Sequence, residues 1–315
     1  MSYAQGQTIA AADFNTLVGT NPNISTNTLN TVWSTGGTAA GYGQTAIATV
    51  TAGNPVAATD WANLVNKTAN SGSHQGTAIT SVSAPVTNGV VTYLSAIPTN
   101  LTSIYTSRLN AATQGSSATA NTATRGSSWS TQLLFTHTVT FANADATRYF
   151  FNSGGQLKIT CSQPSGTSID NLWNLLALAV GTINISAPSS GTATIASTSY
   201  TGIQKTGGSG SASIPLPNNG YYALTTSNAN VFTQTAATGP SGYLSSLINV
   251  NIKSNGTQGS NGDTGNIITI YTLWDEVPDG YTVTSGAATT VTAFAPETTY
   301  LANTWGAITI AGTVA

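Results

Sequence analysis

Apolar and hydroxyl residues alternate along short segments in the second half of the chain, and this period of two constrains the fold most strongly. In LLFTHTVTF (133–141), Leu133, Phe135 and Val139 fall on one face, and the threonines fall on the other. Such alternation is typical of a strand with one buried face. QLKITC (156–161) alternates in the same way. The pattern therefore predicts sheets that bury one face in a core.

Further strand candidates are separated by Gly, Asn and Pro residues typical of turns. They are 182–186, 192–200, 247–253, 266–274, 280–285, 289–294 and 305–314. One strong helix precedes them in SIDNLWNLLALAVG (168–181), where Ser168 is a candidate N-cap, Trp173 belongs to the apolar stripe and Gly181 ends the helix. We expect a mainly β chain, with an antiparallel β-sandwich or jelly-roll-like domain over 131–315 and one packed helix.

The N-terminal third contains an internal repeat at an offset of 47 residues, because GQTIAAADFNTLV (6–18) aligns with GNPVAATDWANLV (53–65). Asp13 and Asp60 would lie in the first turn of a helix, where carboxylates complement the helix dipole. Each helix would have one apolar face. Its members are Phe14, Leu17 and Val18 in the first copy and Trp61, Leu64 and Val65 in the second. Segment 89–109 is a weaker third copy.

A unit of this size cannot bury its apolar face alone, so the copies pack either on one another or on another chain. The connecting segments 19–52 and 66–88 are long and polar, which favours another chain. Residues 110–128 are low in complexity. We therefore predict a helical-repeat region for anchoring or assembly over 1–110, and a flexible linker over 111–130, before the β-rich domain.

Charged residues make up only 5% of the chain, and the net charge is −2. The average share is about 25%. A surface of hydroxyls and amides repels other copies weakly, which suits a protein packed into an assembly. There is no basic stripe for nucleic acid and no apolar run long enough for membrane insertion. The single cysteine, Cys161, excludes an internal disulfide, and we expect it to be buried and inert.

Residues that could carry chemistry are few. His137 lies on an apolar strand face, where a buried histidine is expected, and His74 lies in a predicted loop, where an anchoring role is expected. The acidic set Asp275, Glu276 and Asp279 lies in WDEVPDG, which ends in a Pro-Asp-Gly turn signature, so a turn is expected. A calcium or glycosidase site is the alternative. We predict no enzyme activity and no cofactor.

Three tyrosines are candidate ligand contacts. Tyr221, Tyr222 and Tyr243 stand among Gly, Asn and Pro residues, so we expect them to be more exposed than the other aromatic residues. A tyrosine ring combines apolar area with a polar hydroxyl, and such rings could stack on sugars. Packing in a core is the alternative for each of them.

The stretch RYFFNSGGQLKI (148–159) places one of few basic residues before three aromatic residues and a glycine pair. A guanidinium beside aromatic rings usually stacks on a ring or pairs with a carboxylate. We predict a β-hairpin that turns at 152–155, with a buried ion pair from Arg148 to Asp145 or Asp170. The residues expected to build this architecture are Arg148, Phe150, Phe151, Gly154 and Gly155.

Several of these segments resemble the virion structural proteins of tailed bacteriophages, in particular those of marine and cyanobacterial viruses. The central match is TVTFANADATRYFFNSGGQLKI (138–159), and the helix-forming NLWNLLALAVGTINIS (171–186) follows it. The upstream matches are AAADFNTLV, ATDWANLV and HQGT. The resemblance covers roughly residues 3–186. It implies a particle component without catalytic residues, assembled in the host cytoplasm and located in the virion.

Within that class, an N-terminal anchor, a linker and a Thr/Gly/Asn-rich β-domain favour a tail or baseplate-associated fibre or appendage subunit. Its expected partners are other virion proteins. The chain is also expected to form a homo-oligomer, with a trimer favoured. A capsid decoration protein is the alternative, and the number of copies per particle distinguishes the two. The third hypothesis is a receptor protein that binds or cleaves host surface glycan, supported by the three tyrosines and the acidic set.

Overall fold

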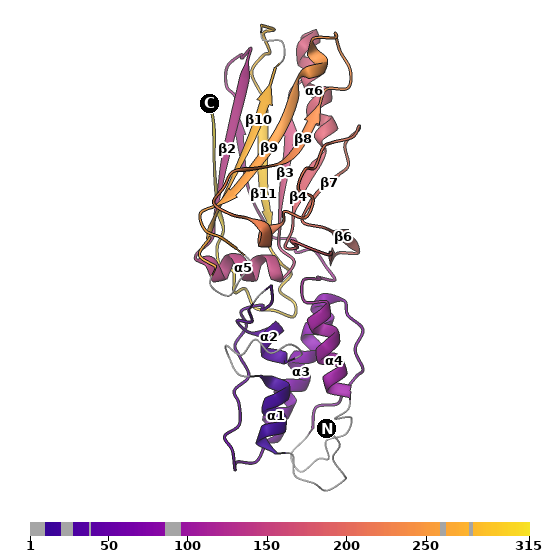
Figure 1. Cartoon of the computed structure of the whole chain (residues 1–315), viewed down its shortest axis with the longest axis vertical. Helices are drawn as coiled ribbons and strands as arrows, with labels where there is room; N and C mark the ends of the chain where they lie inside the picture. The colour runs from indigo at the N-terminus through magenta and orange to yellow at the C-terminus, as the bar shows by residue number, and fades with distance from the viewer. Residues whose placement is uncertain (1–9, 20–27, 38, 86–95, 259–262, 277–279) are drawn as a thin grey trace.

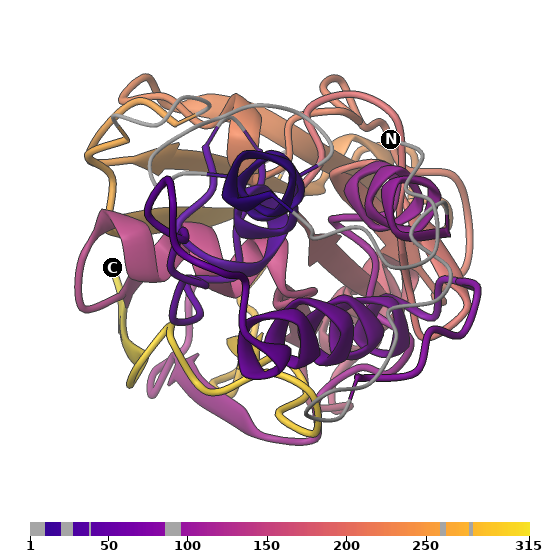
Figure 2. The same ribbon diagram turned by 90° about the horizontal axis from the view of Figure 1, so that it is seen from below.

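The molecule has a helical region at one end of its long axis and a β-sandwich at the other (Figure 1). The computed structural model describes residues 10–19, 28–37, 39–85, 96–258, 263–276 and 280–315. Seen from below, the helical region lies over the end of the sandwich, so the two parts lie in line (Figure 2). No helix in the described ranges is long and apolar enough to cross a lipid bilayer.

Two five-stranded antiparallel sheets form the sandwich. In chain order, the first sheet consists of β1 (Ala118–Thr124), β3 (Gln156–Ser162), β4 (Thr182–Ile185), β7 (Ile203–Thr206) and β11 (Ala288–Phe294), arranged as β1-β11-β3-β4-β7. The second consists of β2 (Gln132–Thr140), β8 (Ala229–Thr235), β9 (Leu247–Ser254), β10 (Ile267–Asp275) and β12 (Thr309–Val314), arranged as β12-β2-β10-β9-β8. A small hairpin joins β5 (Ala193–Ile195) to β6 (Thr198–Tyr200). The prediction of a mainly β, antiparallel fold is confirmed.

The period of two places alternate side chains in the core, as expected. Along β2, Leu133, Phe135, His137 and Val139 are buried, and the residues that alternate with them are half-buried or exposed. Trp173, on α6 (Ser168–Val180), stacks on Trp274 of β10 with 5.5 Å between ring centroids. This helix thus contributes its apolar stripe to the core of the sandwich.

The N-cap of α6 is Thr167 and not Ser168. The Thr167 hydroxyl accepts the Asp170 N–H at 3.3 Å, and the Asp170 carboxylate accepts the Thr167 N–H at 2.8 Å. The Asp170 carboxylate also accepts the N–H of Thr284 at 2.8 Å. These bonds satisfy free donors at the start of the helix. Asp170 was one of the two predicted partners of Arg148, and its carboxylate is instead bonded to Thr167 and Thr284.

The helical region consists of four helices that share one core. They are α1 (Ala11–Val18), α2 (Leu29–Trp33), α3 (Ala58–Gln75) and α4 (Ala96–Thr106). The two repeat helices meet where Phe14 of α1 lies 6.0 Å from Trp61 of α3, between ring centroids. Leu17 and Leu64 are buried in the same core. The copies therefore pack on one another, contrary to the expectation that they pack on another chain.

The acidic residues of the two repeats lie in the first turns of their helices. Asp13 is in the first turn of α1, and Asp60 is in the first turn of α3, where its carboxylate accepts the N–H of Ala57 at 3.0 Å. The residues of the first copy before α1, at 6–9, and those of the weak third copy at 89–95 lie outside the described ranges. The rest of the third copy contains α4.

Asparagine side chains hold the extended segments of the helical region. Asn30 on α2 accepts the N–H of Ile47 at 3.0 Å and donates to its carbonyl at 2.9 Å. Asn15 on α1 pairs with Val50 in the same way, at 2.8 and 2.9 Å. A carboxamide has both a donor and an acceptor, so it can pair with one residue's N–H and C=O as a neighbouring strand would. Helix side chains thus replace strand pairing here.

Three sequence predictions need correction. The predicted linker 111–130 contains β1, which pairs with β11 along its length. Segment 192–200 forms the β5–β6 hairpin because Ala196 and Ser197 adopt φ angles of +48° and +66°, which reverse the chain. Segment 280–285 contributes only a bridge between Val283 and Trp129. Strands β7 and β8 were not predicted, because neither sequence shows a clear alternation.

Replacement of Asn30 by alanine tests this pairing by side chains. The variant leaves the buried N–H and C=O of Ile47 without their partner, so the free energy of unfolding should fall by about 1–3 kcal/mol. Urea denaturation measures it. Asn63→Ala on the exposed side of α3 is the matched control and should change stability by less than about 0.5 kcal/mol. Equal effects of the two variants would contradict the role given to Asn30.

Candidate functional site

A short helix, α5 (Ala144–Asn152), lies at the end of the sandwich that faces the helical region (Figure 1). The predicted hairpin at 148–159 is therefore wrong in its first half. The Asn143 side chain accepts the Ala146 N–H at 2.8 Å and starts the helix. The helix buries Phe150 and Phe151 in the core of the sandwich, whereas a strand would have turned one of them outward.

Arg148 extends from α5 toward the helical region. Its Nη1 donates to the carbonyls of Thr35 at 2.6 Å and Ala40 at 2.8 Å, and its Nη2 donates to Asp145 at 2.7 Å. The arginine side chain is 2% exposed and the aspartate side chain 63% exposed. The predicted ion pair with Asp145 is thus present, but it is not buried as predicted, because the Asp145 carboxylate is exposed to solvent. Burial lowers the pKa of Arg148. The hydrogen bond to Asp145 and the electrostatic effect of nearby tyrosines together raise this pKa by more, so the guanidinium stays charged.

Asn152 is the second residue of α5 that bonds to the helical region. Its Nδ2 donates to the carbonyl of Gly41 at 2.9 Å, and its Oδ1 accepts from the hydroxyl of Tyr222 at 2.6 Å. Together, Arg148 and Asn152 bind three carbonyls of the segment 35–41. We call the contact between the helical region and the sandwich, which is centred on α5, the joint.

The three tyrosines predicted to be exposed are buried. Tyr221, Tyr222 and Tyr243 are 0%, 7% and 1% exposed. Tyr221 stacks on Phe151 with 4.6 Å between ring centroids, and Tyr243 packs edge-on against Trp173. Short 3-10 turns direct these rings inward from the Gly- and Pro-containing loops. The expectation that they are exposed is therefore wrong, and they pack in the core as the alternative had it.

The end of α3 forms the other side of the joint. His74 lies within α3 and is buried, so its assignment to a loop was wrong, and its Nε2 lies 3.2 Å from the Ser153 carbonyl. Gln75 donates to the Tyr42 hydroxyl at 2.7 Å, and this hydroxyl donates to the Arg108 carbonyl at 3.0 Å. Burial lowers the pKa of His74 to about 4, so the ring is neutral at pH 7.

The chain between the two parts is bound on both sides. The N–H and C=O of Ala111 bond to Thr194 and Ala196 of the β5–β6 hairpin at 2.9 and 3.0 Å, and the N–H of Ala112 bonds to the His74 carbonyl at 2.7 Å. A side chain at Gly154, where φ is +89°, would collide with Ala111. The flexible-linker prediction for 111–130 is thus wrong at its start as well.

Gly155, next to Gly154, is also required for a steric reason. A Cβ on Gly155 would lie 2.6 Å from the Phe150 carbonyl oxygen, which no side chain tolerates, so the tight exit from α5 requires glycine.

The C-terminal segment adds a third connection to the helical region, because Gln44 pairs with both the N–H and the C=O of Ala302 at 2.9 and 2.8 Å. The joint therefore has contributions from three separate parts of the sandwich sequence.

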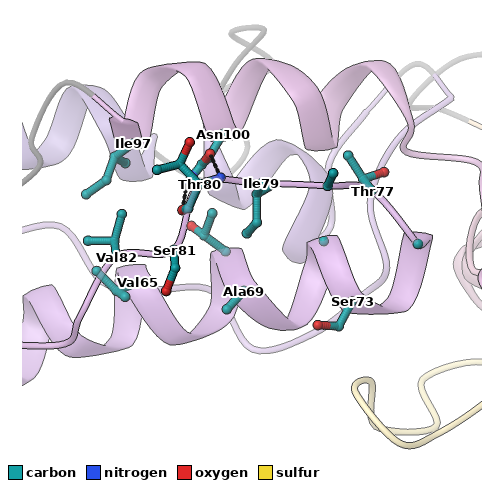
Figure 3. Close-up of a pocket in the computed structure, with 14 residues that line it drawn as sticks. Val65, Ala69, Ser73, Thr77, Ile79, Thr80, Ser81, Val82, Ile97 and Asn100 are labelled. Carbon is teal, nitrogen blue, oxygen red and sulfur yellow. Dashed lines mark hydrogen bonds between the residues drawn. The ribbon is translucent and has the colours of Figure 1, made fainter.

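A groove of about 460 Å³ lies on the side of the helical region (Figure 3). Helix α3, the extended segment 76–82 and helix α4 form its walls, and none of its lining residues is charged. Asn100 of α4 pairs with the N–H and C=O of Thr80 at 2.9 and 2.8 Å, which holds the extended segment in place. The groove is distinct from the joint.

The other candidate residues do not come together. His137 is buried within the sandwich, as expected, and burial lowers its pKa. Cys161 is half-buried on β3, and burial raises the pKa of its thiol to about 12, so the thiol stays protonated. Asp275 ends β10, Glu276 is buried, and Asp279 lies outside the described ranges. Among the described residues, no group of three or more His, Cys, Asp or Glu side chains could hold a metal ion.

Comparisons of the chain with protein-family models, with curated proteins and with solved structures find no match. The joint is therefore described by its own geometry. Sequence reasoning identified Arg148 and its neighbours, but it missed Tyr42, Gln75 and Asn152. The period of a helix or strand gives no signal for a contact between residues about 110 positions apart, such as that of the Asn152 side chain with the Gly41 carbonyl.

Replacement of Arg148 by methionine tests the joint. The variant keeps the length of the side chain but leaves the carbonyls of Thr35 and Ala40 without their donor, so stability should fall by about 2–4 kcal/mol in urea denaturation. Asp145→Asn is the matched control, because the carboxylate is exposed and its loss should cost less than about 1 kcal/mol. If the two variants lost the same stability, the ion pair and not the carbonyl contacts would hold the joint.

His74 predicts a pH dependence of stability. Its pKa is about 4 in the folded chain, against an ordinary value of 6.5, so the unfolded chain binds more protons between these values. This contribution is fully present above pH 6.5 and is lost as the pH falls. It should amount to about 2 kcal/mol between pH 7.5 and pH 5. Unfolding of the wild type and of His74→Gln at both pH values isolates it. An identical pH dependence in the two proteins would contradict the assignment.

Proposed function

We propose that this protein is a non-enzymatic structural protein of a tailed bacteriophage virion, and that it serves as a tail or baseplate-associated appendage. The observation that supports this most is where the resembling segment lies. Residues 138–159 supply the end of β2, the whole of α5 and the start of β3, and α5 carries Arg148 and Asn152 to the joint. The central match to virion proteins is thus the segment that fixes the helical region on the sandwich.

The joint suits an appendage subunit for a physical reason. A subunit that projects from a particle has to transmit a fixed orientation from its attachment region to its outer domain. Here hydrogen bonds from α5, from α3 and from the C-terminal segment hold the helical region in line with the sandwich. In this proposal the helical region attaches to other virion proteins and the sandwich projects.

The composition supports the same proposal. With a net charge of −2 and only 5% charged residues, copies repel one another weakly and can be packed side by side. We propose a homo-oligomer on the particle, with a trimer favoured. A capsid decoration protein would have the same composition, and it differs in how many copies each particle carries. The glycan-binding hypothesis loses its main support, because the three tyrosines are buried.

The test is quantitative mass spectrometry of purified particles of the virus that encodes the chain, with immunogold labelling by an antiserum against the recombinant protein. We expect the protein in the particles and the label at the tail or baseplate. Label distributed over the capsid, with a copy number close to that of the major capsid protein, would favour the decoration protein. Absence of the protein from purified particles would contradict the proposal.

A further inference from the structure

The extended wall of the groove is the second copy of a short internal repeat. TAIATVTA (45–52) and TAITSVSA (77–84) are identical at five of eight positions. Each precedes a helix, α3 in the first case and α4 in the second. The two segments share their isoleucine and valine, so their apolar side chains can be compared position by position.

The first copy is covered more completely than the second. Ile47 is 7% exposed, and Asn30 of α2 pairs with its backbone. The equivalent Ile79 is only half-buried, and its N–H and C=O have no partner among the described residues. The groove opens beside Ile79 (Figure 3). Helix α4 already lies on the second copy, because Asn100 pairs with the backbone of Thr80. Ile79 nevertheless stays half-buried beside the groove, which leaves an apolar surface on which a further element can pack.

The occupant should be uncharged and apolar. Apolar side chains of Val65, Ile79, Val82 and Ile97 lie among hydroxyl and glycine residues in the lining, and no charged residue lines the groove. A charged side chain buried there would find no partner of opposite charge. An apolar helix face placed in such a groove is a recurrent mode of recognition.

One helix of this chain presents such a face to solvent. Leu175 and Leu178 of α6 are 51% and 60% exposed, the highest values among the exposed large apolar side chains of the described residues. They lie one turn apart, on the side of α6 opposite Trp173. The one charged residue of α6 is Asp170, which is buried at the start of the helix. The outward side of α6 is therefore uncharged, and Leu175 and Leu178 are exposed beside Asn171.

We propose that α6 of one copy docks into the groove of a second copy, in a head-to-tail contact. The two surfaces lie toward opposite ends of the long axis, so a copy cannot fill its own groove (Figure 1). Such a contact is heterologous, and repeated contacts give a ring if the rotation closes and a filament if it does not. The weak repulsion between copies of this charge-poor chain allows the approach.

The contact is small, so it is weak between free copies and strengthened on a surface that holds many copies close together. This inference goes beyond the proposed function, because it depends only on the groove and on α6. It holds whether or not the chain belongs to a virion.

Sedimentation equilibrium of the full chain over a range of concentrations tests the proposal. The average mass of the wild type should rise with concentration beyond that of a dimer. Leu178→Lys on α6 and Ala69→Lys in the groove should each weaken self-association about tenfold or more. Both positions are exposed, so folding should be unaffected, and circular dichroism checks this. Leu216→Lys, on an exposed loop elsewhere, is the control and should associate as the wild type does.

A mixture of the two variants gives the decisive result. Each variant keeps one intact surface, so an equal mixture should recover one contact per pair and stop at the heterodimer. Leu175→Lys and Ser73→Lys form a second pair if either first variant misfolds. A wild type whose mass stays that of a monomer at all concentrations would overturn the proposal. So would mixed variants that remain monomeric while the wild type associates.

Discussion

One buried guanidinium connects the two parts of this molecule. The chain has only seven lysine and arginine residues, and Arg148 is buried between the helical region and the sandwich. Its two carbonyl partners lie more than 100 positions away in the sequence, so its burial requires both parts to be folded and in contact. A buried charge that loses its partners is costly, which makes the folding of each part depend on the other.

Neutral carboxamide side chains make many of the other hydrogen bonds that hold the helical region together. Asn15, Asn30, Asn100 and Gln44 each pair with both the N–H and the C=O of one residue in an extended segment. Such pairing satisfies backbone groups that would otherwise need a neighbouring strand. It explains how a helical region with long polar connections can be ordered, and why a chain with so few charges can still be specific in its contacts.

The sequence predicted those parts of the fold that depend on local periodicity. Strand β2, strand β10 and helix α6 follow from spacing alone, and the repeat helices α1 and α3 follow from their apolar faces. Helix α5 was missed because three consecutive aromatic residues favour a strand, although Asn143 is a helix N-cap residue.

The burial of Tyr221, Tyr222 and Tyr243 depends on loops whose path no local pattern specifies. The predicted linker failed for a related reason. A segment of Ala, Thr and Asn has no apolar periodicity, yet β1 forms there because β11 offers it a free edge. The joint itself combines contacts between distant segments, which a single sequence does not reveal.

Differential scanning calorimetry of the full chain tests the central claim most directly. If Arg148 makes the helical region and the sandwich interdependent, the wild type should unfold in one transition, with equal calorimetric and van't Hoff enthalpies. Arg148→Met should then split this transition, with the helical region unfolding first. Two separate transitions in the wild type itself would contradict the account, because the two parts would then be stable independently of the joint.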